Sequence, residues 1–159
     1  MKRVYLIRHG DAEFMGRGRG DHGRILTAEG QEQAKRLGAM LAPAGVQVIL
    51  CSSADRARET AEGLGLTAKL VPLDELYNAG TFGLMQALAS LADSVQVAAL
   101  VAHAPGVPAL VDELAGQDPD PDAAAVVRYS FPTATVAGIE FTGSWADLEG
   151  SRLFWADRG

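Results

Sequence analysis

The stretch Val4-Tyr5-Leu6-Ile7-Arg8-His9-Gly10 decides the fold class of this chain. Its first four residues form a short, fully apolar run with β-branched members, which is typical of a central strand in a parallel sheet. The run ends abruptly at Arg8, so two ionisable side chains and a glycine follow the expected strand. The stretch therefore predicts a buried strand with polar chemistry at its carboxyl end.

Further β-rich runs alternate with helical patterns along the rest of the chain. Strands are predicted at residues 46–50, near Leu70, at 95–102, at 135–141 with one exposed face, and at 152–155 as a short edge strand. Helices are predicted from the cap Thr27 to Gly45, from the caps Ser52 and Ser53 to Gly63, at 82–91 and at 107–115. The Asp-Pro-rich run 117–122 is predicted to be a surface loop. This succession predicts an α/β fold: a single three-layer domain over residues 1–159, with a mostly parallel central sheet and helices on both faces.

The composition is that of a globular protein, and it narrows the range of partners. Apolar residues make up 48% and charged residues 21%, and the net charge is -6 with a pI near 5.0. Such an acidic chain is a poor match for nucleic acid, and no stretch has the length of a membrane span or the apolar region of a signal peptide. The single cysteine, Cys51, excludes an intrachain disulfide and fits the reducing cytoplasm. Since Cys51 ends an apolar run, we expect it to be a buried core residue and not a catalytic thiol.

Positive charge gathers in the first third of the chain. Residues 1–60 hold ten Lys or Arg against seven Asp or Glu, whereas residues 61–159 hold four against thirteen. An anionic ligand is therefore expected to bind near the first third. Within it, Arg17, Arg19 and Lys35 are expected to be solvated surface charges.

Polar side chains follow three of the predicted strands. Arg8 and His9 follow the first strand, Arg56 lies one turn beyond the second, and His103 follows the strand at 95–102. Ligands of open parallel sheets bind outside the carboxyl ends of the strands. We therefore expect both imidazoles and both guanidiniums to line one pocket.

These residue types suit phosphoryl transfer. A neutral imidazole is a good nucleophile towards phosphorus, and neighbouring arginines favour the neutral form by disfavouring a second positive charge. We predict that His9 is the nucleophile and that Arg8, Arg56 and His103 hold the phosphoryl oxygens.

Two small residues are expected to assist in binding the phosphate. Gly10 lets the backbone approach it closely. Ser52 begins the helix after the second predicted strand, and the amino end of that helix adds a partial positive charge.

Three blocks of the sequence resemble the signature of the histidine phosphatase superfamily, also called the phosphoglycerate mutase-like fold. They are Leu6-Ile7-Arg8-His9-Gly10, Ser52-Ser53-Ala54-Asp55-Arg56-Ala57-Arg58-Glu59-Thr60-Ala61 and Val101-Ala102-His103-Ala104-Pro105-Gly106. The arginine of the family's second block maps to Arg56, and the histidine of its third block maps to His103. The blocks occur in the family's order and together span most of the chain. The resemblance implies a phosphatase that forms a covalent phosphohistidine intermediate on His9.

Within the superfamily, the short chain is similar to the SixA-like branch, the phosphohistidine phosphatases. Residues 21–27, Asp-His-Gly-Arg-Ile-Leu-Thr, resemble that branch after the first loop, and the resemblance implies that Arg24 is a further phosphate contact. Asp21 then either orients Arg24 or serves as an acid. Phe131-Pro132-Thr133 and Trp145 also resemble that branch. The expected partner is a phosphohistidine-carrying protein or a phosphorylated small molecule, and no metal or other cofactor is expected.

The chain departs from larger members of the superfamily in one respect. Those members place a Glu or Asp in an insertion after the block of Arg56 to protonate the leaving oxygen. Here the region is short, and its candidates are Asp74 and Glu75, for which a solvated loop position is the alternative. A phosphohistidine needs less help, because its leaving imidazole can be protonated on nitrogen before cleavage. The lack of an obvious acid thus favours a phosphoramidate over an alkyl phosphate.

Other functions are weaker matches. A Ser-His-Asp hydrolase built from Ser53, His103 and Asp112 lacks the Gly-x-Ser-x-Gly elbow. A zinc enzyme lacks a close pair of ligands, and His22 is expected to be exposed in a glycine-rich loop. A phosphoryl-binding module without turnover would need only the arginines, so the presence of two histidines argues against it. A broad-range sugar-phosphate phosphatase or a mutase-like enzyme remains an alternative.

Overall fold

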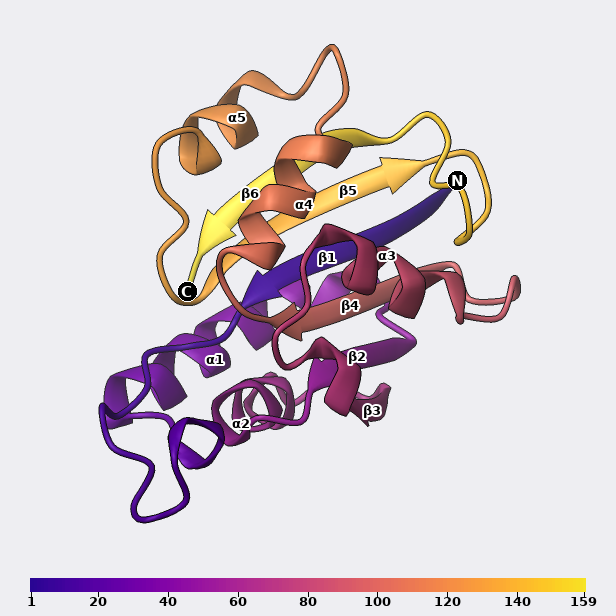
Figure 1. Ribbon diagram of the computed structural model, residues 1–159. Coiled ribbons are helices and arrows are strands. Elements are labelled where there is room, and N and C mark those ends of the chain that lie inside the picture. Colours follow the sequence, from indigo (N-terminus) through magenta and orange to yellow (C-terminus); the bar gives the residue numbers. More distant parts are fainter.

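A six-stranded sheet runs through the computed structural model, which describes residues 1–159 (Figure 1). Its strands are β1 (Lys2–Arg8), β2 (Val48–Ser52), β3 (Lys69–Leu73), β4 (Val97–Ala102), β5 (Thr135–Phe141) and β6 (Arg152–Arg158). Their spatial order is β3-β2-β4-β1-β5-β6. Strands β3, β2, β4 and β1 are parallel, while β5 is antiparallel to both of its neighbours. The prediction of a mostly parallel sheet, with the run Val4 to Ile7 buried near its centre, is confirmed.

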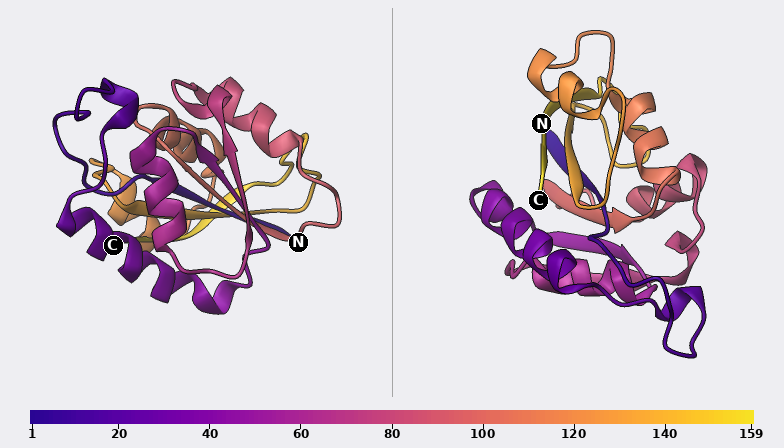
Figure 2. Two further views of the ribbon diagram at one scale, coloured as in Figure 1. Left: turned by 90° about the horizontal axis from the view of Figure 1, so that it is seen from below. Right: turned by 90° about the vertical axis from the view of Figure 1, so that its left-hand side faces the viewer.

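Helices cover both faces of this sheet (Figure 2). They are α1 (Ala28–Leu41), α2 (Asp55–Gly63), α3 (Thr81–Ala89), α4 (Gly106–Leu114) and the short α5 (Pro121–Val127). The apolar side chains of β1 alternate between two cores: Leu6 packs with α3 and α4, and Ile7 packs with α1 and α2. The three-layer α/β architecture is thereby confirmed. None of the helices combines the length and the apolar character needed to cross a membrane.

Local signals begin and end α1 as predicted. The Thr27 hydroxyl accepts a hydrogen bond from the Gly30 amide at 3.0 Å, which caps the first turn. After a short 3-10 turn at Ala42–Ala44, Gly45 adopts a φ of 72° and ends the helical segment.

The second block of the sequence folds differently from the prediction. The strand begins at Val48 and runs to Ser52, two residues further along than expected, so Ser52 belongs to the sheet. Helix α2 therefore begins at Asp55, and its cap, Ala54, makes no side-chain hydrogen bond. The prediction that Ser52 and Ser53 cap this helix is wrong. Because Ser52 stays in the strand, its hydroxyl is directed to other partners, described below.

The C-terminal third differs from the prediction in burial and length. Strand β5 lies between β1 and β6 with both faces covered, so it is buried except at Glu140 and does not have the exposed face that its alternation suggested. The run 117–122 is not all loop, because Asp120 caps α5 by accepting from the Ala123 amide at 2.9 Å. Strand β6 continues to Arg158, since it pairs with β5 along its whole length.

Candidate active site

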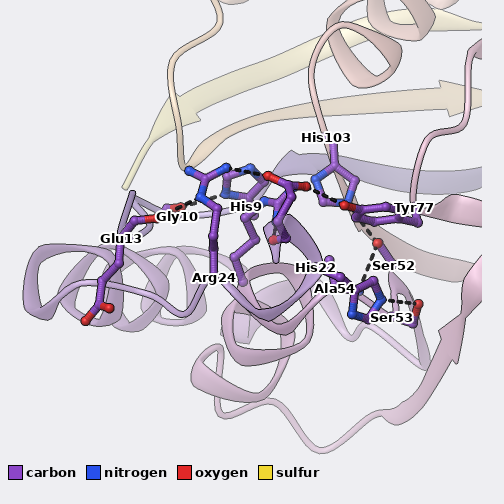
Figure 3. A network of polar contacts seen from close by, with 12 residues as sticks. His9, Gly10, Glu13, His22, Arg24, Ser52, Ser53, Ala54, Tyr77 and His103 are labelled. Carbon is purple, nitrogen blue, oxygen red and sulfur yellow. Dashed lines mark hydrogen bonds and ion pairs between the residues drawn. The ribbon is translucent and has the colours of Figure 1, made fainter. Parts of the chain in front are cut away.

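The ends of β1 and β4 bring two histidines together at one edge of the sheet. The strands are adjacent and parallel, with Arg8 in register with Ala102. The His9 amide continues the ladder by donating to the Ala102 carbonyl at 3.0 Å. The ring centroids of His9 and His103 lie 5.3 Å apart (Figure 3). The two imidazoles therefore border the same small volume.

A cavity of about 350 Å³ opens between them. Side chains singled out in the sequence contribute half of its lining: Arg8, His9, Arg24, Arg56 and His103. The other lining residues are Asp11, Ala12, Phe14, Ala104 and Thr133. Guanidinium and imidazole donors gathered around one small cavity are suited to a compact oxyanion.

Burial and one hydrogen bond fix the state of His9. Its Nδ1 lies 2.7 Å from the Gly10 carbonyl oxygen. A carbonyl only accepts, so Nδ1 carries the proton and donates, and Nε2 keeps its lone pair. Burial is the main cause that lowers the pKa of His9 to about 4, and the charges of Arg56 and Arg8 lower it further. The ring is therefore neutral at pH 7, with Nε2 unprotonated.

His103 is held by a hydroxyl on the neighbouring strand. Its Nε2 lies 2.8 Å from Ser52 Oγ, which also accepts from the Ala54 amide at 3.2 Å. Nε2 is the one acceptor within hydrogen-bond distance of the Ser52 hydroxyl proton, so we assign the hydroxyl as the donor and Nδ1 as the protonated nitrogen of the neutral ring. Burial, with the neighbouring His9 and Arg56, lowers the pKa of His103 to about 3. Nδ1 is buried without a protein partner, and it is the atom left to hydrogen-bond a ligand.

Arg8 is a partly buried cation without an acidic partner. Its Nη1 donates to the Phe131 carbonyl at 3.0 Å, and its Nε has no partner in the protein. Burial lowers the pKa of this guanidinium, and none of the chain's ion pairs includes it. A desolvated positive charge of this kind is stabilised when an anion binds beside it.

The Asp21 carboxylate links two arginines of the cavity lining, Arg24 and Arg56. Arg56 donates to Asp21 twice, from Nη1 to the backbone carbonyl at 2.8 Å and from Nη2 to the carboxylate at 3.1 Å. Arg24 Nη1 donates to the other carboxylate oxygen at 3.0 Å, and the Tyr77 hydroxyl donates to the same carboxylate. The Tyr77 and Arg24 hydrogen bonds hold the pKa of Asp21 well below its usual range. Asp21 therefore remains a carboxylate that orients two arginines, and it is a poor proton donor.

Comparison with known proteins decides the family. Residues 4–80 match the model of the histidine phosphatase superfamily (branch 1). An uncharacterised protein of Mycobacterium leprae is 33% identical over 132 residues, which cover 81% of each chain. A Nakamurella multipartitia protein assigned as phosphohistidine phosphatase SixA superposes with a TM-score of 0.88 at 32% identity, over 98% of this chain and 95% of that one. The chain belongs to the histidine phosphatase superfamily.

Membership in this superfamily, together with the likeness to SixA, supports a phosphatase, and the likeness confirms the branch that the sequence resembles. The protein histidine phosphatase SixA complexed with tungstate also superposes on it, with a TM-score of 0.78 at 25% identity, over 98% of this chain and 96% of that one. Each of the three sequence blocks that resemble the family contributes residues to the lining of the cavity.

Some residues expected at the phosphatase site lie just outside its lining. The Gly10 amide donates to Thr60 Oγ1 at 3.0 Å, and a Cβ on Gly10 would lie 2.9 Å from the Gly30 carbonyl oxygen. Gly10 thus makes room for α1. Ser52 contacts His103 but not the cavity, and Glu75 is exposed in the 3-10 turn Asp74–Leu76, outside the lining.

Sequence reasoning missed several residues that shape the candidate site. Thr60 accepts from Gly10 and donates to the Arg56 carbonyl at 2.7 Å, so it joins the first and second blocks. Tyr77 packs edge-on against His103, with ring centroids 5.7 Å apart. Phe14 lines the cavity from the loop after β1. Thr60 lies within the second family block, and that position could have identified it. The local sequence around Tyr77 and Phe14 gives no such signal.

The structure does not support the Ser53-based hydrolase, the catalytic thiol or the zinc enzyme. Ser53 Oγ lies 3.0 Å from the exposed His22, and Ser52 is the serine that contacts His103. Cys51 is buried as predicted, and burial raises the pKa of its thiol to about 11. No three His, Cys, Asp or Glu side chains gather closely enough to hold a metal ion.

Proposed function

We propose that this phosphatase acts through a covalent phosphohistidine formed on His9. The observation that carries the proposal is the 2.7 Å hydrogen bond between His9 Nδ1 and the Gly10 carbonyl. It leaves Nε2 as the one ring atom with a lone pair available for attack. Because the ring is also neutral at pH 7, no proton has to leave before phosphorus is attacked.

The proposed reaction has two displacement steps. In the first, a bond forms between His9 Nε2 and phosphorus while the bond from phosphorus to the leaving atom breaks. The leaving group departs with a proton that it takes up from solvent, or that a phosphohistidine already carries on its leaving imidazole. In the second, water attacks phosphorus, the bond to Nε2 breaks, and inorganic phosphate and a proton are released. His9 returns to its neutral state after each cycle.

Donors around the cavity would stabilise the transferred group in both steps. Charge spreads over three oxygens in such transition states, and fixed cationic donors provide much of the acceleration. Arg8 supports this role because it has no carboxylate partner, and His103 supports it because Nδ1 is unpartnered. Arg24 and Arg56 line the same cavity, and Asp21 holds both of them in place.

We propose a phosphohistidine-carrying protein, or a small phosphomonoester, as the substrate. The similar structures assigned to SixA, one of them complexed with tungstate, support a phosphoryl substrate. The acid–base arrangement favours the phosphohistidine, because its leaving imidazole is protonated on nitrogen before cleavage. Neither Asp21, which stays ionised, nor Glu75, which lies outside the lining, supplies a proton readily to an alkyl oxygen.

Turnover of an aryl phosphate by wild type and His9→Ala tests the nucleophile. We expect the variant to lose at least about a thousandfold in turnover while it still binds vanadate, because the arginines remain. His22→Ala is the matched control, since it removes an exposed histidine outside the lining, and its rate should stay within about twofold of wild type. If wild type and His9→Ala were both inactive and bound phosphate equally, the result would instead support a phosphoryl-binding module.

A substrate panel tests the substrate class. It compares a phosphorylated histidine-containing transfer domain with sugar phosphates and an aryl phosphate. A higher kcat/KM for the protein supports the phosphohistidine, whereas similar values across the small esters support a broad-range phosphatase.

A further inference from the structure

Phe14 is an exposed aromatic side chain at the phosphatase cavity. It is 96% exposed, although it belongs to the lining of that cavity. Isolated exposed apolar residues are common and need no explanation, but this one borders the reacting groups. It belongs to the loop between β1 and α1, and this loop leaves the sheet at the carboxyl end of β1 (Figure 1).

The backbone that carries Phe14 is anchored on both sides of Glu13. The Glu13 amide donates to the Ile25 carbonyl at 2.8 Å, and the Glu13 carbonyl accepts from Arg24 Nε at 2.7 Å. One residue earlier, Ala12 forms an antiparallel bridge with Leu26. The aromatic ring is therefore presented on a fixed backbone. Arg24 both lines the cavity and holds the carbonyl next to Phe14 in place.

The cavity lining contains both polar and apolar side chains. The arginines and the two histidines offer hydrogen-bond donors to phosphoryl oxygens, whereas the side chains of Ala12, Phe14 and Ala104 offer only apolar surface. In an in-line displacement the leaving group lies opposite the nucleophile. With His9 as that nucleophile, the leaving group lies on the far side of phosphorus from His9. Among the apolar side chains of the lining, Phe14 has by far the largest surface to offer it.

We propose that Phe14 is the leaving-group contact of this enzyme and selects phosphoryl groups carried on a planar ring. The proposal rests on the proposed function, because it needs His9 as nucleophile to orient the leaving group. A phenyl face is complementary to the face or edge of an aromatic or imidazole ring, and it offers nothing to a leaving group without a ring. Phe14 would thus distinguish ring-borne phosphoryl substrates from the compact phosphates that the same donors hold.

Two substrates with the same type of bond test this proposal. Phosphoimidazole and phosphoramidate both break a P–N bond, but only the first has a ring as leaving group. We expect Phe14→Ala to lower kcat/KM for phosphoimidazole about tenfold more than for phosphoramidate, the size expected of one aromatic contact. Phe14→Trp should restore the preference. Phe82→Ala is the matched control, since Phe82 is 70% exposed on α3 and lies outside the cavity, and it should leave both values at the wild-type level.

The outcomes separate this proposal from the function on which it rests. Equal losses on both substrates with Phe14→Ala, or no loss on either, would overturn the role of Phe14 and leave the phosphatase mechanism intact. A wild type that hydrolyses neither compound would overturn the proposed function and this proposal with it. Phenyl phosphate and a phosphohistidine protein serve as further arms: a loss on both assigns ring recognition in general, and a loss on the protein alone assigns the imidazole ring.

Discussion

The His9 amide donates to the carbonyl oxygen of Ala102 at 3.0 Å, one residue before His103. This hydrogen bond joins two segments more than ninety residues apart at the point where their strands end. It sets the separation of the two imidazoles by backbone geometry and not by side-chain packing alone.

Replacing Arg8 tests whether the cavity is built for an anion. Arg8→Met keeps the length of the side chain and removes a desolvated cation that has no acidic partner. We expect vanadate binding to weaken by at least about a hundredfold, since a charge-assisted contact in a desolvated site is lost. The unfolding free energy of the ligand-free protein should stay equal or rise by about 1–2 kcal/mol, because a desolvated cation is costly. Calorimetric titration and urea unfolding measure the two effects.

Arg36→Met is the control for this experiment, because Arg36 is an exposed cation paired with Glu29 on α1. It should change neither quantity beyond about 0.5 kcal/mol. Unweakened vanadate binding by Arg8→Met would remove Arg8 from the site.

Ser52 is predicted to set the tautomer of His103. Its hydroxyl donates to Nε2 at 2.8 Å, so Ser52→Ala frees the ring to place its proton on either nitrogen. We expect kcat to fall about tenfold, with vanadate affinity reduced, because Nδ1 no longer carries the proton in every molecule. Nitrogen NMR shifts of the His103 ring should move from one tautomer towards a mixture. Ser53→Ala is the control, since the Ser53 hydroxyl hydrogen-bonds to the exposed His22 and not to His103, and an equal effect of both variants would contradict the assignment.

Two carboxylates can be compared for their part in the reaction. Asp21 orients Arg24 and Arg56, whereas Glu75 is exposed outside the lining. We expect Asp21→Asn to lower kcat/KM by about tenfold to a hundredfold, since one neutral amide replaces two charge-assisted pairs. Glu75→Gln should stay within about twofold of wild type, for alkyl and aryl phosphates alike. A selective loss on alkyl phosphates with Glu75→Gln would identify Glu75 as the general acid after all.

The depressed histidine pKa values predict how stability depends on pH. In the folded chain the pKa of His9 is lowered from 6.5 to about 4, so between these values the unfolded chain binds a proton that the folded chain does not. The unfolding free energy is therefore unaffected above pH 7 and falls as the pH drops through 6.5. At 1.36 kcal/mol per pH unit, His9 accounts for about 2 kcal/mol of that loss at pH 5.

Urea unfolding at pH 7 and pH 5 in phosphate-free buffer measures this effect. His9→Gln lacks the titrating ring, so it should lose about 2 kcal/mol less than wild type over the same interval. Identical losses in the two proteins would show that His9 is not held neutral by the fold.

Much of the site was predictable because a general rule of parallel sheets applies to it. Arg8 is the last residue of β1, His9 and His103 directly follow the ends of β1 and β4, and such ends share one edge of the sheet. Arg56 follows one turn beyond a third strand end. Arg24 came only from the family resemblance, since nothing in its local sequence separates it from a surface arginine.

Other features could not be predicted because they depend on contacts between distant segments. The role of Ser52 depends on β2 extending to that residue, and boundary positions are weakly encoded in local patterns. Asp21 contacts Arg56 and Tyr77, which lie 35 and 56 residues away. Its role as an orienting carboxylate, and not an acid, follows from those partners. The local sequence shows which of these side chains are present, but it does not show which of them contact one another.

Rapid acid or base quenching during turnover, followed by mapping of the trapped phosphate, tests the central claim most directly. With a labelled substrate in excess, we predict that label accumulates on His9 and that NMR assigns it to Nε2, because Nδ1 is bound to the Gly10 carbonyl. Label on His103, a serine or Cys51, or turnover that proceeds with no labelled protein at any quench time, would contradict the account.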